Sequence, residues 1–149
     1  MAFKPIETQY KGFRFRSRLE ARWAVFFDEL GLSWSYEPEG YQIEHGGEIV
    51  FYLPDFEVEG LGVVEVKGPA LNKTDRFKIE AFVAEAERDV LLLSNIPPQM
   101  EAGLHDVCAL IDDEVAWLDV DLQYKYGWAE YERALDAARQ ARFEHGEKG

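Results

Sequence analysis

A short apolar strand that carries two opposite charges constrains this chain more than any other feature. Residues 52–68 read YLPDFEVEGLGVVEVKG, and in the last strand of this stretch Glu65 and Lys67 point to one face while the valines between and before them point to the other. An acid and a lysine on an otherwise apolar strand are costly unless they are paired or bind a metal. Asp55 precedes the glycine-containing turn, so antiparallel pairing around that turn is expected to bring Asp55 close to Glu65.

The expected proximity of Asp55 and Glu65 suggests a metal site. Two close carboxylates repel each other, and a hard divalent cation such as Mg²⁺, which prefers oxygen ligands, removes the repulsion. The metal could polarise a phosphoryl oxygen, while Lys67 orients or helps to deprotonate an attacking water. Plainer alternatives stay open: Asp55 could be a turn acid, and Glu65 and Lys67 could be an ion pair on a solvated face.

The remaining pattern predicts a mixed α/β chain. A first helix is expected from the S-x-x-E capping box at Ser17 to a stop at Gly31, with apolar residues at helical spacing between them. Further helices are expected at 75–87, 99–105 and 128–143. Strands are expected at 33–36, 41–43, 48–53, 62–67, 90–93, 109–111 and 115–118. This order predicts an α/β sandwich around a mixed sheet, with large aromatics such as Trp23 and Trp128 in the core.

Charge is distributed unevenly along the 149 residues, whose net charge is −13. Through Phe27, six basic and two acidic residues give +4, whereas ten basic and 27 acidic residues give −17 in the remainder. A local basic surface on an acidic body is therefore expected. Its basic residues, with Arg22 among them, either clamp phosphates or form a solvated face.

The motif Pro54-Asp55 followed by Glu65-Val66-Lys67 resembles that of the PD-(D/E)XK nuclease superfamily. The chain order also resembles the core of that superfamily: a helix bearing a glutamate, a meander with PD and ExK, then a helix and a strand. The runs FRSRLEARWAVFFDELGLSWSYEPEG and YLPDF…VEVKG are similar to small single-domain proteins of bacteriophages and actinobacteria assigned to it. The similarity covers Tyr10 to Lys78 and is loose in the acidic C-terminal half.

This resemblance implies a restriction-endonuclease-like fold, a three-layer α/β sandwich with a central mixed β-sheet flanked by helices. One nuclease-like domain is expected over residues 1–149, with a basic arm at 1–16 and an acidic helix at about 128–143. The arm itself is expected to form an extended segment or a short hairpin.

The resemblance also implies roles for individual residues. Asp55 and Glu65 would bind Mg²⁺, for which Mn²⁺ can substitute, together with the backbone carbonyl of Val66. Lys67 would be the catalytic lysine, and Glu20 an auxiliary ligand or base partner. From the helix alone, Glu20 could instead be only the N3 residue of the capping box.

The implied activity is metal-dependent hydrolysis of DNA phosphodiester bonds, directed by DNA structure or context, in phage or bacterial DNA processing, recombination or repair. A non-catalytic nucleic-acid- or protein-binding module on a nuclease fold is the alternative, and a structural phage protein with an incidental motif is a third. DNA contacts are expected from six basic residues: Lys11, Arg14, Arg16, Arg18, Lys73 and Lys78.

Expected partners are DNA, a second copy of the chain, and a protein bound by the acidic C-terminal half. The apolar runs are too short to cross a membrane, and residues 1–12 lack the apolar segment of a secretory signal. The expected location is cytoplasmic, in the host cytoplasm if the chain is phage-encoded. The one cysteine, Cys108, excludes an internal disulfide framework and is expected to be buried and inert.

Overall fold

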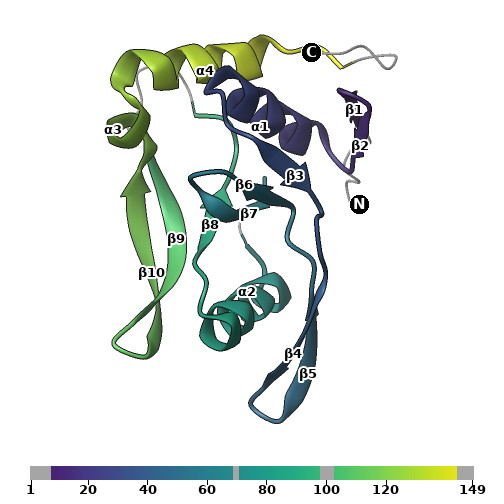
Figure 1. The fold of residues 1–149 in the computed structure, drawn as a ribbon, viewed down its shortest axis with the longest axis vertical. Helices are drawn as coiled ribbons and strands as arrows, with labels where there is room; N and C mark the ends of the chain where they lie inside the picture. The colour runs from purple at the N-terminus through teal and green to yellow at the C-terminus, as the bar shows by residue number, and fades with distance from the viewer. Residues whose placement is uncertain (1–7, 69–70, 98–102, 144–149) are drawn as a thin grey trace. The chain divides into compact units, whose positions relative to one another are not determined.

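The computed structural model describes residues 8–68, 71–97 and 103–143, which divide into two compact units (Figure 1). Unit 1 contains the described parts of Met1–Ser33, Ile96–Gly103 and Leu122–Gly149. Unit 2 contains the described parts of Trp34–Asn95 and Leu104–Asp121. The whole 52–68 stretch therefore lies in unit 2, whereas Glu20 lies in unit 1.

A mixed six-stranded sheet forms the centre of unit 2. Its order is β10-β9-β8-β7-β6-β3, and among these neighbours only β7 and β8 run parallel. A parallel pair needs a long crossover connection, which here contains helix α2 (Lys73–Ala86). The strands are β3 (Trp34–Tyr36), β6 (Phe56–Val58), β7 (Gly62–Val66), β8 (Val90–Leu93), β9 (Leu104–Ile111) and β10 (Glu114–Asp121).

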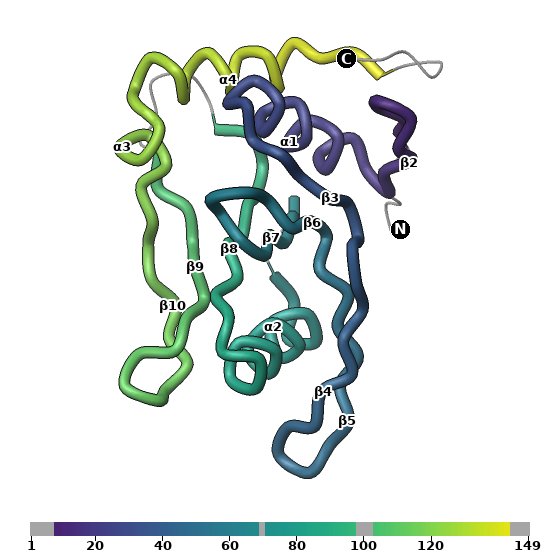
Figure 2. Tube along the Cα trace, in the orientation of Figure 1, coloured from purple at the N-terminus to yellow at the C-terminus, as the bar shows by residue number. Residues whose placement is uncertain are grey.

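Helix α2 lies between two hairpins of unit 2, the β9–β10 hairpin and the hairpin of β4 (Tyr41–His45) and β5 (Glu48–Tyr52) (Figures 1 and 2). It packs against all four of these strands. The shared core includes Phe82 of α2, Val63 of β7 and Cys108 of β9. Val63 and Glu65 are two residues apart on β7, so their side chains lie on the same face of the sheet. The face that packs in this core is therefore also the face that carries Glu65.

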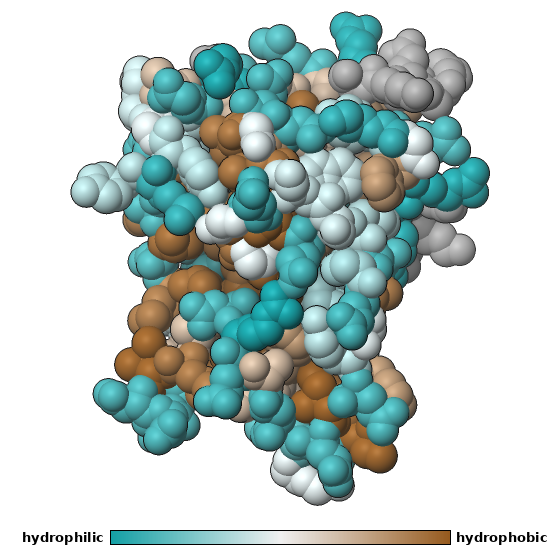
Figure 3. All heavy atoms as spheres, viewed as in Figure 1, coloured by the Kyte–Doolittle hydropathy of each residue, from teal (hydrophilic) through white to brown (hydrophobic). Residues whose placement is uncertain are grey.

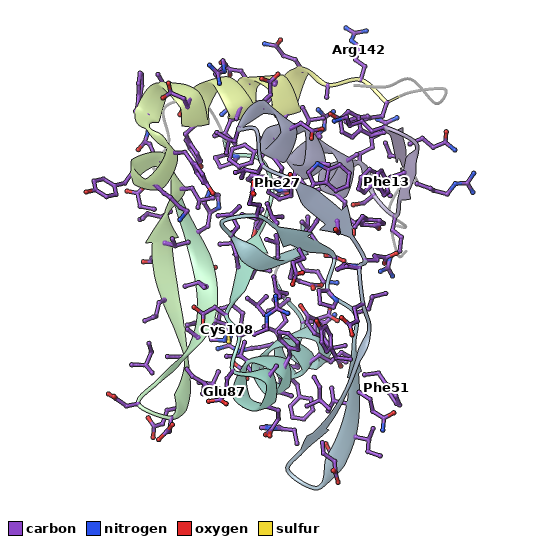
Figure 4. All side chains as sticks on the ribbon, viewed as in Figure 1. Phe13, Phe27, Phe51, Glu87, Cys108 and Arg142 are labelled. Atoms are coloured by element: carbon purple, nitrogen blue, oxygen red, sulfur yellow. The ribbon has the colours of Figure 1, made fainter. Side chains whose placement is uncertain are left out.

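The side chains of β5 alternate between an inner and an outer face, and this alternation directs Tyr52 inward. Val50 and Tyr52 are buried, whereas Ile49 and Phe51 are exposed, Phe51 by 65%. Figure 4 shows Phe51 projecting away from α2, and Figure 3 shows apolar side chains remaining on the surface near the ends of the hairpins. The inward direction of Tyr52 brings its phenol towards β7.

Unit 1 is built from helices and one short hairpin. Strands β1 (Thr8–Tyr10) and β2 (Phe13–Phe15) pair antiparallel, and helix α1 (Arg18–Glu29) packs against them and against α4 (Trp128–Gln140). Helix α3 (Leu122–Tyr126) packs on α4. The hydroxyl of Ser17 accepts from the amide of Glu20 at 3.1 Å, and Gly31 has a φ of +73°, so the expected helix start and stop are confirmed.

Aromatic packing joins α1 to α4 within unit 1. The rings of Phe26 and Tyr131 meet edge to face at 5.7 Å, and Trp23 meets Phe26 in the same way at 4.9 Å. All three side chains are fully buried. The core position expected for Trp23 is thus confirmed, but that of Trp128 is wrong, since Trp128 begins α4 and is 54% exposed.

Several expected boundaries are wrong, each for a physical reason. The short strands expected at 109–111 and 115–118 are the last part of β9 and the first half of β10. The polar residues at the other ends of these strands, such as His105 and Asp106 in β9, interrupt the apolar pattern. The helix expected at 99–105 cannot include residues 104 and 105, which begin β9, and its residues 99–102 lie outside the described part of the chain. Strand β6 and helix α3 are too short to leave a periodic signal.

The described residues confirm the mixed α/β class and the central mixed sheet, accompanied by four helices. The restriction-endonuclease-like three-layer arrangement and the single domain over 1–149 remain predictions. In the part of the chain that the structure describes, no helix is long and apolar enough to span a membrane.

Candidate active site

Asp55 is fixed in place by backbone groups on both sides. The strands β6 and β7 pair antiparallel with Phe56 opposite Val64, as expected from the turn between them. This register brings the amide of Val66 to the Asp55 side chain, where it donates to Oδ2 at 2.8 Å. The backbone carbonyl of Asp55 accepts from the amide of Glu37 at 2.8 Å. Asp55 is therefore a buried carboxylate with a set orientation, and not a solvated turn acid.

Glu65 is buried on β7 and held by a phenol. Its side chain Oε1 accepts from the hydroxyl of Tyr52 at 2.8 Å, and the residue is only 6% exposed. Burial raises the pKa of the Glu65 carboxyl, although the hydrogen bond from Tyr52 and the ammonium of Lys67 partly oppose the rise. Burial also raises the pKa of Tyr52, so this phenol remains a proton donor.

Asp55 and Glu65 are neighbours in the site. Asp55 Oδ2 accepts from the amide of Val66, the residue that follows Glu65, and both acidic residues are buried. A hydrogen bond with Asp55 is among the influences that oppose the rise in the pKa of Glu65. Two carboxylates buried at one place repel each other unless a proton or a cation offsets their charge.

Lys67 lies between two carboxylates. Its Nζ is 3.9 Å from Oε2 of Glu65 and 3.2 Å from Oδ2 of Asp75 in α2. Burial alone lowers the pKa of Lys67, but these carboxylates outweigh burial, and the pKa is raised. The solvated-face interpretation of Glu65 and Lys67 is therefore wrong for Glu65, while Lys67 is a charged, half-buried group at the same site.

Asp75 and Tyr52 are the residues of this cluster that the sequence reasoning missed. The side chain of Asn72 caps α2 by accepting from the amide of Asp75 at 2.8 Å, which places Asp75 in the first helical turn. For Asp75, the sequence did contain a signal, which is a helix start within a few residues of the end of β7. This start is the run Asn72-Lys73-Thr74-Asp75.

Glu20 lies in unit 1, apart in the chain from the other site residues. It is buried at the third position of α1, and its backbone amide donates to the side chain of Ser17, the N-cap residue. The half of the capping box in which Ser17 accepts from the amide of Glu20 is confirmed, whereas a bond from the Glu20 side chain back to the Ser17 amide stays a prediction. Its role as an auxiliary ligand or base partner remains a prediction.

The basic residues fall into two groups. In unit 1, Arg14 is exposed on β2, Lys11 is exposed at the hairpin turn and pairs with Asp28 at 3.2 Å, and Arg16 is exposed, whereas Arg18, which begins α1, is half-buried. In unit 2, Lys73 is exposed at the start of α2 and Lys78 is half-buried in the same helix. None of these placements tests DNA contact.

Arg22 makes structural contacts within unit 1 that neither interpretation of the basic residues anticipated. Its Nη1 donates to the carbonyls of Ala138, Arg139 and Ala141 at 2.6, 2.9 and 3.1 Å. These carbonyls belong to the C-terminal end of α4, where backbone acceptors lack helical partners. The guanidinium therefore links α1 to the end of α4.

The donor set of the site fits a magnesium ion. Among residues 8–68, 71–97 and 103–143, no group of three or more His, Cys, Asp or Glu side chains is arranged to hold a metal. Mg²⁺ in nucleic-acid enzymes is commonly bound by one or two carboxylates, with water and substrate phosphates completing the shell. Asp55 and Glu65 meet that smaller requirement, and each has one oxygen oriented by a protein donor.

Comparisons with known protein families, curated proteins and solved structures found no match to this chain. Outside the site, Cys108 is buried, and burial raises the pKa of its thiol to about 12, so the expected inert cysteine is confirmed.

Proposed function

We propose that this chain is a Mg²⁺-dependent nuclease of the PD-(D/E)XK type that hydrolyses DNA phosphodiester bonds. The observation that carries the proposal is a pair of buried acids at adjoining strands, with Asp55 bonded to the amide that follows Glu65 and with Lys67 Nζ 3.9 Å from Glu65. Buried acids held together in this way are expensive to retain, and a function that needs their charge explains them.

Each residue has a role in this proposal. Asp55 and Glu65 hold the cation, with the carbonyl of Val66 as a further oxygen ligand. When bound, Mg²⁺ supplies positive charge against the phosphate and lowers the pKa of water. The contacts of Lys67 with two carboxylates favour a cationic group that positions the water and stabilises developing charge, rather than a neutral base.

DNA binding is proposed for the basic hairpin of unit 1 and for two lysines of α2. Arg14 and Arg16 are exposed, and neutralising phosphates with such residues releases counterions. Replacing both by alanine should weaken binding and reduce the slope of log K against log salt by about 2. An unchanged affinity and slope would remove the hairpin from the proposal.

A substrate panel tests the nuclease directly. Single-stranded, duplex, flap, nicked and four-way DNA and RNA are incubated with Mg²⁺ or Mn²⁺ at low salt. Asp55→Asn should abolish cleavage and Lys67→Met should slow it to a rate that only single-turnover assays detect. In contrast, Asp112→Asn and Lys125→Met, which change exposed residues that are not part of the proposed site, should cleave like the wild type. Metal-dependent cleavage with this pattern supports the proposal, and the substrate cut identifies the preferred structure.

A non-catalytic binding module remains a second candidate, because the polar and charged groups of the site already have partners within the protein. Asp55 is bonded to Val66, Glu65 to Tyr52, and Lys67 pairs with Asp75. Such a network could be structural without any metal. Thermal melting with Mg²⁺ separates the two functions: a rise that Asp55→Asn abolishes supports the enzyme, and no effect of Mg²⁺ on either chain supports the module.

A further inference from the structure

Lys67 and Asp75 form an ion pair whose two backbones are both anchored. The amide of Lys67 donates to the carbonyl of Leu93 at 2.9 Å, which ties the residue after β7 to β8. Asp75 is fixed in the first turn of α2 by the Asn72 cap. The distance between Lys67 Nζ and Asp75 Oδ2 is 3.2 Å, shorter than the 3.9 Å to Oε2 of Glu65.

Cation binding would change the balance around Lys67. A cation bound by Glu65 would offset the negative charge that attracts Lys67. It would also repel the Lys67 ammonium, whose Nζ is 3.9 Å from Oε2 of Glu65. A lysine has a long flexible stem, so without another partner its ammonium would leave the site. Asp75 is a carboxylate of unit 2 that already contacts Nζ and is not one of the proposed ligands.

We propose that Asp75 is a positioning residue for the nuclease reaction: it holds the Lys67 ammonium beside Asp55 and Glu65 when these two residues bind the cation. This inference rests on the proposed nuclease function and extends it, since the sequence motif assigns no role to Asp75.

Two ordinary roles of Asp75 have to be separated from positioning. An acid in the first turn stabilises a helix through its dipole, and a half-exposed ion pair contributes little to stability. Glu130 is a matched control, because it is an exposed acid in the first turn of α4. Glu130→Gln removes a comparable helix-end charge without touching the site.

The test is a double-mutant cycle on Asp75 and Lys67, measured by single-turnover cleavage at saturating Mg²⁺. Asp75→Asn should lower the rate about 10- to 100-fold, as for other residues that orient an active-site group, with unchanged DNA affinity. Asp75→Glu should recover part of the rate, and Glu130→Gln should match the wild type. In a Lys67→Met background, Asp75→Asn should have no further effect.

Two results would overturn the positioning role while leaving the nuclease intact: a rate within twofold of wild type for Asp75→Asn, or the same loss with and without Lys67. Calorimetry of Mg²⁺ binding provides a readout independent of cleavage. Unchanged affinity in Asp75→Asn is expected, and lost affinity would make Asp75 a ligand and not a positioning residue. A wild-type chain that cuts no substrate overturns the proposed function, and with it this inference.

Discussion

The side chain of Asp55 accepts a hydrogen bond from the backbone amide of Val66 at 2.8 Å, which locks the PD segment onto the ExK strand. The two segments are eleven residues apart in the chain, and the antiparallel pairing of β6 with β7 brings them together. The carboxylate thus has a structural contact as well as its proposed role with the cation. Variants of Asp55 have to separate these two contributions.

Asp55→Asn should keep the fold and lose the metal response. The amide oxygen can still accept from Val66, whereas Asp55→Ala leaves a buried donor unsatisfied, which costs about 1–3 kcal/mol. Chemical denaturation should therefore rank the wild type and Asp55→Asn together above Asp55→Ala. Equal stability of all three proteins would show that this bond contributes nothing.

Glu65→Gln should stabilise the metal-free protein at alkaline pH. Because the pKa of Glu65 is raised on folding, its favourable contribution is complete below the unfolded pKa and is lost as pH rises through the folded pKa. The variant should melt at a higher temperature than the wild type at pH 8 and at the same temperature near pH 4.

The control for this effect is Glu44→Gln, which changes an exposed glutamate on β4. Its melting temperature should follow that of the wild type at both pH values. Saturating Mg²⁺ should reverse the ranking, since the wild type then gains binding energy that Glu65→Gln lacks. A Glu65→Gln protein less stable than the wild type at pH 8 without metal contradicts the raised pKa.

His105 should make the protein acid-sensitive. It is buried at the start of β9, and burial lowers its pKa to about 4 although Asp121 opposes the change. Because folding lowers the pKa of His105, its neutral form contributes its full stability above the unfolded pKa near 6.5. This contribution is lost as the pH falls towards 4. The loss should amount to on the order of 3 kcal/mol across this window. Denaturation of His105→Gln should show a flatter pH profile there, and parallel profiles would contradict the prediction.

Arg22→Ala should destabilise the α1–α4 pair. The guanidinium donates to three carbonyls at the end of α4, and hydrogen bonds from charged groups contribute about 1.5–3 kcal/mol. Arg142→Ala changes an exposed arginine two residues beyond α4 and serves as the control (Figure 4). A denaturation midpoint for Arg22→Ala equal to that of the control would show that the three contacts are dispensable.

Local signals explain which parts of the fold could be predicted. The cap at Ser17, the stop at Gly31 and the apolar run 90–93 each specify their element through near neighbours, and all three are confirmed. The ends of β9 and β10 were missed because they are decided by pairing between strands. Polar residues are acceptable there, since each strand supplies hydrogen bonds to the other regardless of side chain.

The candidate site divides in the same way. Alternation along β7 was enough to predict that Glu65 and Lys67 share a face, and the turn after β6 was enough to bring Asp55 near. The partners Tyr52 and Asp75 depend on how β5 and α2 pack on the sheet, which no spacing in the sequence specifies.

The central claim is that Asp55 and Glu65 together form a divalent-cation site, and calorimetric titration with Mg²⁺ tests it most directly. The wild type should bind one ion per chain and release protons, seen as a heat that depends on the buffer, because burial raises the pKa of Glu65 and a cation binds its charged form. Asp55→Asn should bind none, and Asp112→Asn, which changes an exposed residue between β9 and β10, should bind like the wild type. Absence of binding to the wild type, or equal binding by Asp55→Asn, would contradict the account.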